Sequence, residues 1–72
     1  MNIFINKQHK EIHKNSTLYQ ILSDPIAIGL NIINQKGYAI AVNNQVVQKN
    51  FWHTHILYEN DNVIIIQATS GG

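Results

Sequence analysis

The sequence of 72 residues contains no cysteine, no arginine, a single proline and only four glycines. The absence of cysteine excludes disulfides, zinc sites with thiolate ligands and a cysteine nucleophile. A chain of 8.2 kDa has room for one small domain, which buries about 60% of the surface that it exposes when unfolded. Because no disulfide can support such a domain, its stability must come from the packing of its core.

Charge and long apolar runs are scarce as well. Five lysines and four acidic residues give a net charge of +1, whereas nucleic-acid binding relies on many phosphate contacts from clustered lysine and arginine. Two histidines and a glutamate separate Lys7, Lys10 and Lys14, so we expect no nucleic-acid binding. No apolar run approaches the roughly 18 residues of a membrane span, and no signal peptide opens the chain. We therefore expect a cytoplasmic protein without a membrane segment.

Apolar residues nevertheless make up 44% of the chain, and thirteen of them are isoleucines. This content is enough for a core and too high for a disordered chain. Runs of β-branched residues indicate several short strands. The predicted strands cover residues 2–6, 10–14, 38–42, 46–47 and 63–66. Polar residues at 7–9 and a tight turn at 43–45 would join the first four strands into two hairpins.

One helix is predicted between these hairpins. Thr17 and Gln20 have the spacing of a capping box at a helix start. Three apolar residues then fall on one helix face, namely Leu18, Ile21 and Leu22. Pro25 ends this helix or begins a second short one, and residues 26–36 fit a helix and an extended chain equally well.

This order predicts an α+β domain over residues 1–67, with one main helix across one face of a mixed sheet of about five strands. The last strand would pair beside the first in the middle of the sheet. Alternation along the strands assigns a core face, packed on the apolar face of the helix. The expected members of this face are Ile3, Ile5, Ile40, Val42, Val63 and Ile65. Residues 68–72 are expected to form a flexible tail.

No group of side chains indicates catalysis or metal binding. His9 and His13 lie four residues apart, but in a hairpin this spacing separates them by about 13 Å. His53 and His55 have no nearby carboxylate or thiolate that would complete a metal site. Glu59 and Asp61 fit an acidic turn better than an acid–base pair, the serines lack the surroundings of a nucleophile, and no glycine-rich phosphate loop is present. We therefore expect neither a catalytic side chain nor a bound metal.

The C-terminus is the one remaining candidate. Gly71 and Gly72 have no Cβ atom, so they can enter a narrow tunnel in a partner enzyme. The five residues from Ala68 span at most about 17 Å when extended. A glycine pair at this position is either an incidental frayed end or the carrier of a reactive carboxylate.

Several stretches resemble the ThiS family of sulfur carriers, which are ubiquitin-like β-grasp proteins of thiamin thiazole biosynthesis. The matching residues are Met1–Asn6, Ala39–Asn43, Val46–Val47, Trp52, Ile56–Leu57, Asp61–Ile66 and Gly71–Gly72. The sequence departs from the family pattern at Gln48–Lys49, where proline and arginine are common, and at Asn60, where a turn glycine is common.

The resemblance implies that Gly72 carries the sulfur. An α-carboxylate with the usual pKa of about 3.5 is ionised at neutral pH and is a poor electrophile. An E1-like, ThiF-like partner would adenylate it with ATP and magnesium. A persulfide donor would then replace AMP to form a thiocarboxylate, and a ThiG-like thiazole synthase would receive the sulfur. The chain itself would be no enzyme and would bind no cofactor.

Two other functions fit the same residues. The chain could serve another pathway, as the small subunit of molybdopterin synthase or a carrier for tRNA thiolation does. It could instead be a β-grasp binding module whose Gly-Gly end is incidental. Loss of Gly71 and Gly72 would abolish the function of a carrier and leave the affinity of a binding module unchanged.

A partner surface is predicted on the second face of the sheet. If Val63 and Ile65 point at the helix, Ile64 and Ile66 point the other way. Phe4 would join them, and the small side chains of Ala39 and Ala41 would keep this face flat. An exposed apolar patch of this kind usually marks an interaction site. The alternative is a second small core, covered by a loop or by another copy of the chain.

Overall fold

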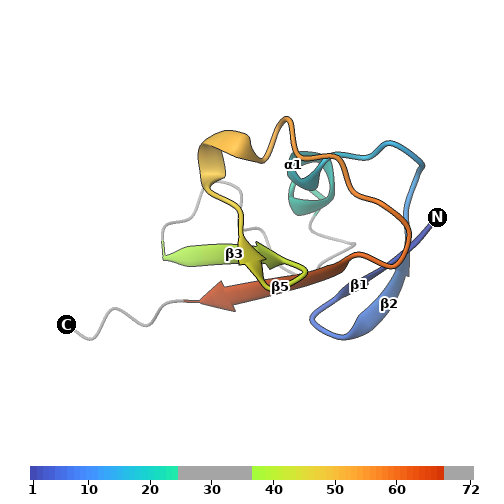
Figure 1. The fold of residues 1–72 in the computed structure, drawn as a ribbon, viewed down its shortest axis with the longest axis horizontal. Coiled ribbons are helices and arrows are strands. Elements are labelled where there is room, and N and C mark those ends of the chain that lie inside the picture. Colours follow the sequence, from blue (N-terminus) through green and yellow to red (C-terminus); the bar gives the residue numbers. More distant parts are fainter. Residues whose placement is uncertain (25–36, 68–72) are drawn as a thin grey trace.

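Five strands, one short α-helix and one 3-10 turn make up the part of the chain that the computed structural model describes, residues 1–24 and 37–67 (Figure 1). The elements in chain order are β1 (Asn2–Ile5), β2 (Gln8–Glu11), α1 (Leu18–Leu22), β3 (Tyr38–Val42), β4 (Gln45–Val46), the 3-10 turn η1 (Lys49–Phe51) and β5 (Asn62–Gln67). The undecided stretch 26–36 and the predicted tail 68–72 lie outside the described residues.

The strands form one mixed sheet in the order β2-β1-β5-β3-β4. The central strand β5 runs parallel to β1 and antiparallel to β3, and the outer pairs β1–β2 and β3–β4 are antiparallel hairpins. The last strand therefore lies beside the first in the middle of the sheet, as predicted. A helix on one face of such a sheet is an α+β architecture.

Both hairpins turn on two residues in the left-handed region of φ. These residues are Asn6 (φ 50°) and Lys7 (φ 69°) in the first hairpin, and Asn43 (φ 52°) and Asn44 (φ 70°) in the second. Two consecutive positive φ angles match the twist of paired strands. The first turn thus falls earlier than the predicted break at 7–9, and β2 covers 8–11 instead of 10–14. The prediction was wrong there because lysine, which carries a Cβ atom, gives little sign of adopting a positive φ.

The helix begins with the predicted capping box. The backbone N–H of Thr17 donates to Gln20 Oε1 at 2.8 Å, and the backbone N–H of Gln20 donates to Thr17 Oγ1 at 3.2 Å. Helix α1 continues for only five residues, to Leu22, with Ser23 as its C-cap. So short a helix is marginal by itself in water, so its packing against the sheet must hold it.

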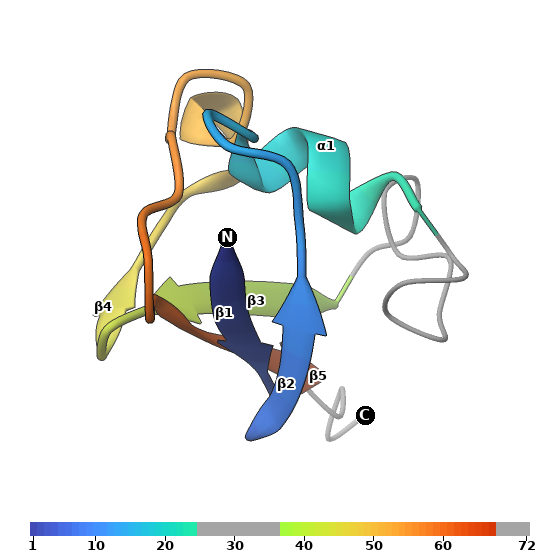
Figure 2. The same cartoon turned by 90° about the vertical axis from the view of Figure 1, so that its right-hand side faces the viewer.

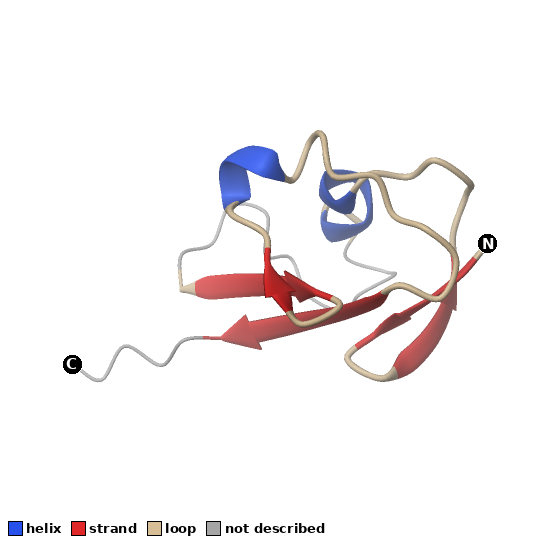
Figure 3. Ribbon diagram, viewed as in Figure 1, coloured by secondary structure: helices blue, strands red, loops and turns tan. Residues whose placement is uncertain are grey.

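The core lies between one face of the sheet and the segments that cover it. Both helical elements lie on this same side (Figures 2 and 3). The predicted core residues are confirmed, with Ile65 only partly buried at the edge of the core. Two further residues from the link after β4 complete it, because Trp52 and Leu57 are almost fully buried. The Trp52 Nε1–H donates to the Val47 carbonyl at 2.8 Å, which satisfies the only polar atom of the ring.

Candidate functional site

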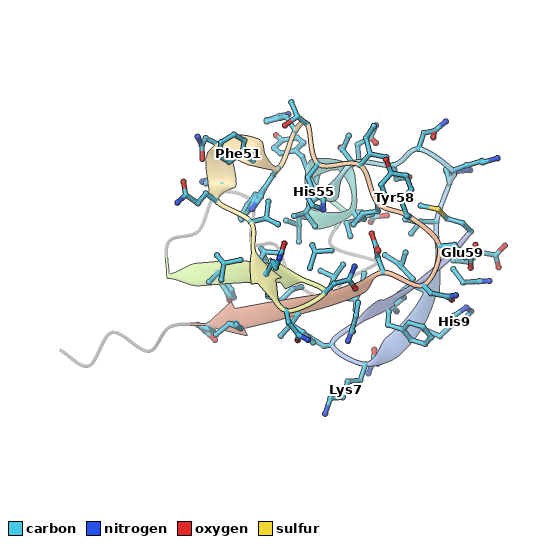
Figure 4. All side chains as sticks on the ribbon, in the orientation of Figure 1. Lys7, His9, Phe51, His55, Tyr58 and Glu59 are labelled. Atoms are coloured by element: carbon cyan, nitrogen blue, oxygen red, sulfur yellow. The ribbon has the colours of Figure 1, made fainter. Side chains whose placement is uncertain are left out.

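The acidic turn before β5 is a structural element. Asp61 is 9% exposed, and its carboxylate accepts hydrogen bonds from Asn43 Nδ2 at 2.9 Å and from the backbone N–H of Tyr58 at 2.8 Å. Glu59 accepts a hydrogen bond at 3.1 Å from the backbone N–H of Asn2. Figure 4 shows Glu59 near the start of the chain. Both carboxylates thus fix the loop that leads into β5, as the turn interpretation predicts.

The histidines lie on β2 (His9), in the loop before α1 (His13) and in the loop after η1 (His53 and His55). His9 lies on β2, where its Nε2 is 2.8 Å from Asn2 Oδ1. His53 stacks on Tyr19 with 3.7 Å between ring centroids, which ties the loop after η1 to α1. Within residues 1–24 and 37–67, no group of three histidine or acidic side chains is arranged to hold a metal ion.

Two asparagine side chains hold β5 from both of its sides. On the β3 side, Asn43 Oδ1 accepts from the backbone N–H of Asn62 at 2.9 Å, and the Asn43 N–H donates to the Asn62 carbonyl at 2.8 Å. On the β1 side, Asn6 Oδ1 accepts from the backbone N–H of Ile65 at 2.8 Å, and the Asn6 N–H donates to the Val63 carbonyl at 2.8 Å. Sequence patterns showed turn and strand residues here but not these long-range bonds.

The register brings together the residues predicted for the partner surface. Ala39 lies opposite Ile66 and Ala41 lies opposite Ile64 across the β3–β5 pair. Phe4 lies opposite Asn62 on the other side of β5, one alternation step before Ile64. Since paired residues share a face of the sheet, these side chains project away from the core. We call the set the outer face: Phe4, Ala39, Ala41, Ile64 and Ile66.

Exposure on the outer face is uneven. Ile66 is 46% exposed, and Phe4, Ala39 and Ile64 are half-buried. Ala41 is only 8% exposed, so it does not belong to an exposed patch as we expected. Its cross-strand partners Ile64 and Val46 flank it on both sides and shield its single methyl group. The outer face is thus only partly exposed, with Ile66 accessible to solvent and Ala41 buried between its neighbours.

One apolar residue of this surface was missed from the sequence. Val46 on β4 pairs with Ala41 and therefore lies on the same side of the sheet. It is 67% exposed, more than any predicted member. The hairpin register could have revealed Val46 in the sequence, because a two-residue turn at Asn43 and Asn44 places Val46 opposite Ala41.

No described segment lies over the outer face. Figures 1 and 2 place α1, η1 and their connecting loops on the opposite side of the sheet. Figure 4 places Phe51 and Tyr58, two other exposed apolar side chains, on that same helix side. Within the described residues, the outer face is therefore open to solvent and to a partner.

The candidate reactive end follows directly from the central strand. β5 ends at Gln67, opposite Tyr38 at the start of β3. Gly71 and Gly72 lie outside the described residues, five positions or fewer beyond this anchor. The sheet therefore fixes where the last residues begin.

A membrane-spanning helix is not found among residues 1–24 and 37–67, because neither described helix has the required length and apolar character.

Comparisons with known proteins agree with this arrangement. The model of the ThiS family matches residues 3–72. The sulfur carrier protein ThiS of Escherichia coli (strain K12) is 28% identical over 72 residues, which is 100% of both chains. A crystal structure of the thiamine biosynthesis protein ThiS from Geobacter metallireducens matches with a TM-score of 0.78 over 100% of both chains, at 16% identity. This structural likeness concerns the fold alone, and it confirms the expected ubiquitin-like β-grasp architecture.

Proposed function

This chain belongs to the ThiS family, and from this premise we propose that it is a sulfur carrier for thiamin thiazole synthesis, with Gly72 as the residue that bears the sulfur. The observation that carries the proposal is the family match, which runs through the Gly-Gly end. The fold adds a physical reason. The last five residues follow β5, which pairs with β3 up to Gln67, so a partner would meet them at a defined place.

The proposed chemistry begins with activation of the Gly72 carboxylate. One of its oxygens attacks the α-phosphorus of ATP in an E1-like adenylating enzyme, and pyrophosphate leaves. A persulfide sulfur then attacks the acyl carbon and expels AMP. A thiol finally cleaves the sulfur–sulfur bond, which leaves a thiocarboxylate on the carrier and a disulfide on the donor. ATP and magnesium belong to the enzyme in this scheme.

The residues of the carrier present the terminal carboxylate to the partner enzyme. Gly71 and Gly72 have no side chains, so the terminal carboxylate can enter a narrow active site. The tail can reach at most about 17 Å beyond Gln67, so the body of the carrier must dock close to the active site. A thiazole synthase that accepts the sulfur would meet the same geometric limit.

We assign the docking role to the outer face. It holds the exposed Ile66 and Val46 beside the half-buried Ile64 and Phe4, and no described segment covers it. Apolar patches of this kind are typical of protein interaction sites. Its position supports the assignment, because Ile66 directly precedes Gln67, from which the tail departs.

Intact-mass spectrometry provides the test. The full chain is incubated with an E1-like adenylating enzyme, ATP, magnesium and a persulfide donor. We expect the mass increase that replacement of one oxygen by sulfur produces, and its loss when ATP is omitted. The matched control lacks Gly71 and Gly72. It should keep the folded circular dichroism spectrum and show no mass change.

Three results would contradict all or part of the proposal. If the full chain stays unmodified while the same enzyme modifies another carrier, Gly72 does not take part in sulfur transfer. If the truncated chain still bound its partners with full affinity and supported thiazole synthesis, the chain would be a binding module with an incidental end. Transfer of the sulfur to a molybdopterin precursor or to tRNA, with none to thiazole synthase, would keep the chemistry and change the pathway.

A further inference from the structure

The two sides of β5 are paired over different lengths. On the β3 side, the pairing runs along the whole strand, from Val42–Val63 to Tyr38–Gln67. On the β1 side, it covers only Phe4–Asn62 and Ile5–Val63. Figure 1 shows β5 running past the end of β1 while β3 stays beside it. Among the described strands, the second half of β5 is therefore paired on its β3 side and open on its β1 side.

The hydrogen bonds show which backbone groups face the open side. The N–H of Asn43 donates to the Asn62 carbonyl, so residues 62, 64 and 66 direct their backbone groups toward β3. Residues 63, 65 and 67 then direct theirs toward β1. Val63 and Ile65 bond there with Asn6. The Ile65 carbonyl and both backbone groups of Gln67 lie beyond Asn6. Among the described residues, neither the β1 pairing nor a turn or loop bond reaches them.

A charged residue borders this open edge. Lys7 follows Asn6 in the hairpin turn and is exposed. Its side chain projects outward from the turn (Figure 4), and no described acidic group pairs with it. A lysine beside an open strand often serves only to prevent edge-to-edge aggregation. Here, however, the open edge leads directly into the residues that must be presented, which favours a functional pairing.

We propose that the adenylating enzyme adds an extended segment to the sheet along this edge, in the place that β1 vacates. The segment would bond with the Ile65 carbonyl and with the N–H and carbonyl of Gln67, and an acidic side chain at its end would face Lys7. Backbone pairing of this kind is an established mode of peptide recognition. This inference rests on the proposed function and adds to it a second contact, distinct from the outer face. Pairing up to Gln67 would fix the direction in which the tail leaves the sheet before it enters the active site.

Amide hydrogen exchange measured by NMR tests the pairing directly. In the free carrier, the Gln67 amide should exchange rapidly because it lacks a described acceptor. In the complex with the E1-like enzyme, without ATP, its exchange should slow by about tenfold or more. Ile66 is the internal control, because its N–H already faces Ala39 in the β3 ladder and its exchange should change much less.

Two variants at one position test the contribution to activity. Gln67→Pro removes the N–H that faces the open edge and no bond of the β3 ladder, whereas Gln67→Ala keeps that N–H. We expect Gln67→Pro to raise the KM for the carrier in adenylation by about tenfold, the value of one hydrogen bond, and Gln67→Ala to change it little. Lys7→Glu should also raise KM, with Lys14→Glu as the matched control of the same charge change.

The outcomes separate this inference from the proposed function. Normal adenylation with no protection of the Gln67 amide in the complex would overturn the strand pairing and leave the carrier function intact. Equal KM values for Gln67→Pro and Gln67→Ala would overturn it as well. Absence of any adenylation of the full chain would overturn both proposals. The exchange measurement needs no variant, so it decides the question even if Gln67→Pro fails to fold.

Discussion

The two faces of the sheet are built from the same strands, yet they differ in what covers them. On the helix side, Ile3, Ile40 and Val63 are completely buried beneath α1 and the link that contains Trp52. On the outer face, Ile66 and Val46 keep about half or more of their surface exposed, and no described segment lies above them. In β5, Val63 thus contributes to the core on one side, whereas Ile64 and Ile66 belong to the proposed docking surface on the other.

This difference shows how a chain of this size divides its apolar residues. A small domain buries a limited fraction of its surface, and the described elements of this chain cover only one face of the sheet. The covered face supplies the stability of the fold. The face left open costs little stability and provides an apolar surface next to the candidate reactive end.

The largest effect is expected from truncation on the covered face. Ile40→Ala should lower the free energy of unfolding by about 2 to 5 kcal/mol, because it leaves a cavity in a closely packed core. Ile66→Ala is the matched control on the outer face and should cost clearly less. Urea denaturation followed by circular dichroism measures both. Equal losses for the two variants would show that the outer face is a second core.

A charge on the outer face should act mainly on function. Ile66→Asp should lower the stability by less than about 1 kcal/mol. In contrast, it should reduce the kcat/KM of adenylation by about 30-fold, since burial of a charge at an interface anchor costs about 2 kcal/mol. Tyr58→Asp, at an apolar residue on the helix side that is more exposed than Ile66, is the control and should leave adenylation unchanged. Unaltered kcat/KM in Ile66→Asp would remove this face from docking.

The smallest effect is expected at the start of the covering helix. Thr17→Ala removes the side-chain acceptor of the capping box and should lower the stability by about 1 kcal/mol. Adenylation should stay within twofold of the original value, because α1 lies on the face away from the proposed docking surface. A selective loss of adenylation with unchanged stability would place the helix side in the partner interface.

Local patterns in the sequence predicted much of this architecture. The capping box at Thr17 and Gln20, the apolar positions of the helix and the alternation in three strands depend on neighbours within a few residues, so they are visible in the chain alone. The order of the predicted elements also led to the expected pairing of the first and last strands, which the sheet confirms. The proposed role of Gly72 as the reactive residue came from the family resemblance, and Gly72 lies outside the residues that the structure describes.

The tertiary structure decided the features that depend on contacts between distant residues. Trp52 and Leu57 enter the core from a link without regular periodicity, so their burial becomes apparent only when that link lies across the sheet. The bond between Asn6 and the Ile65 amide joins residues 59 positions apart, and no local pattern encodes it. The register showed that Ala41 is shielded and that Val46 extends the outer face. The sequence alone determined which residues are apolar and how they alternate, whereas the order and length of strand pairing determined which of them, and which backbone groups, remain open to a partner.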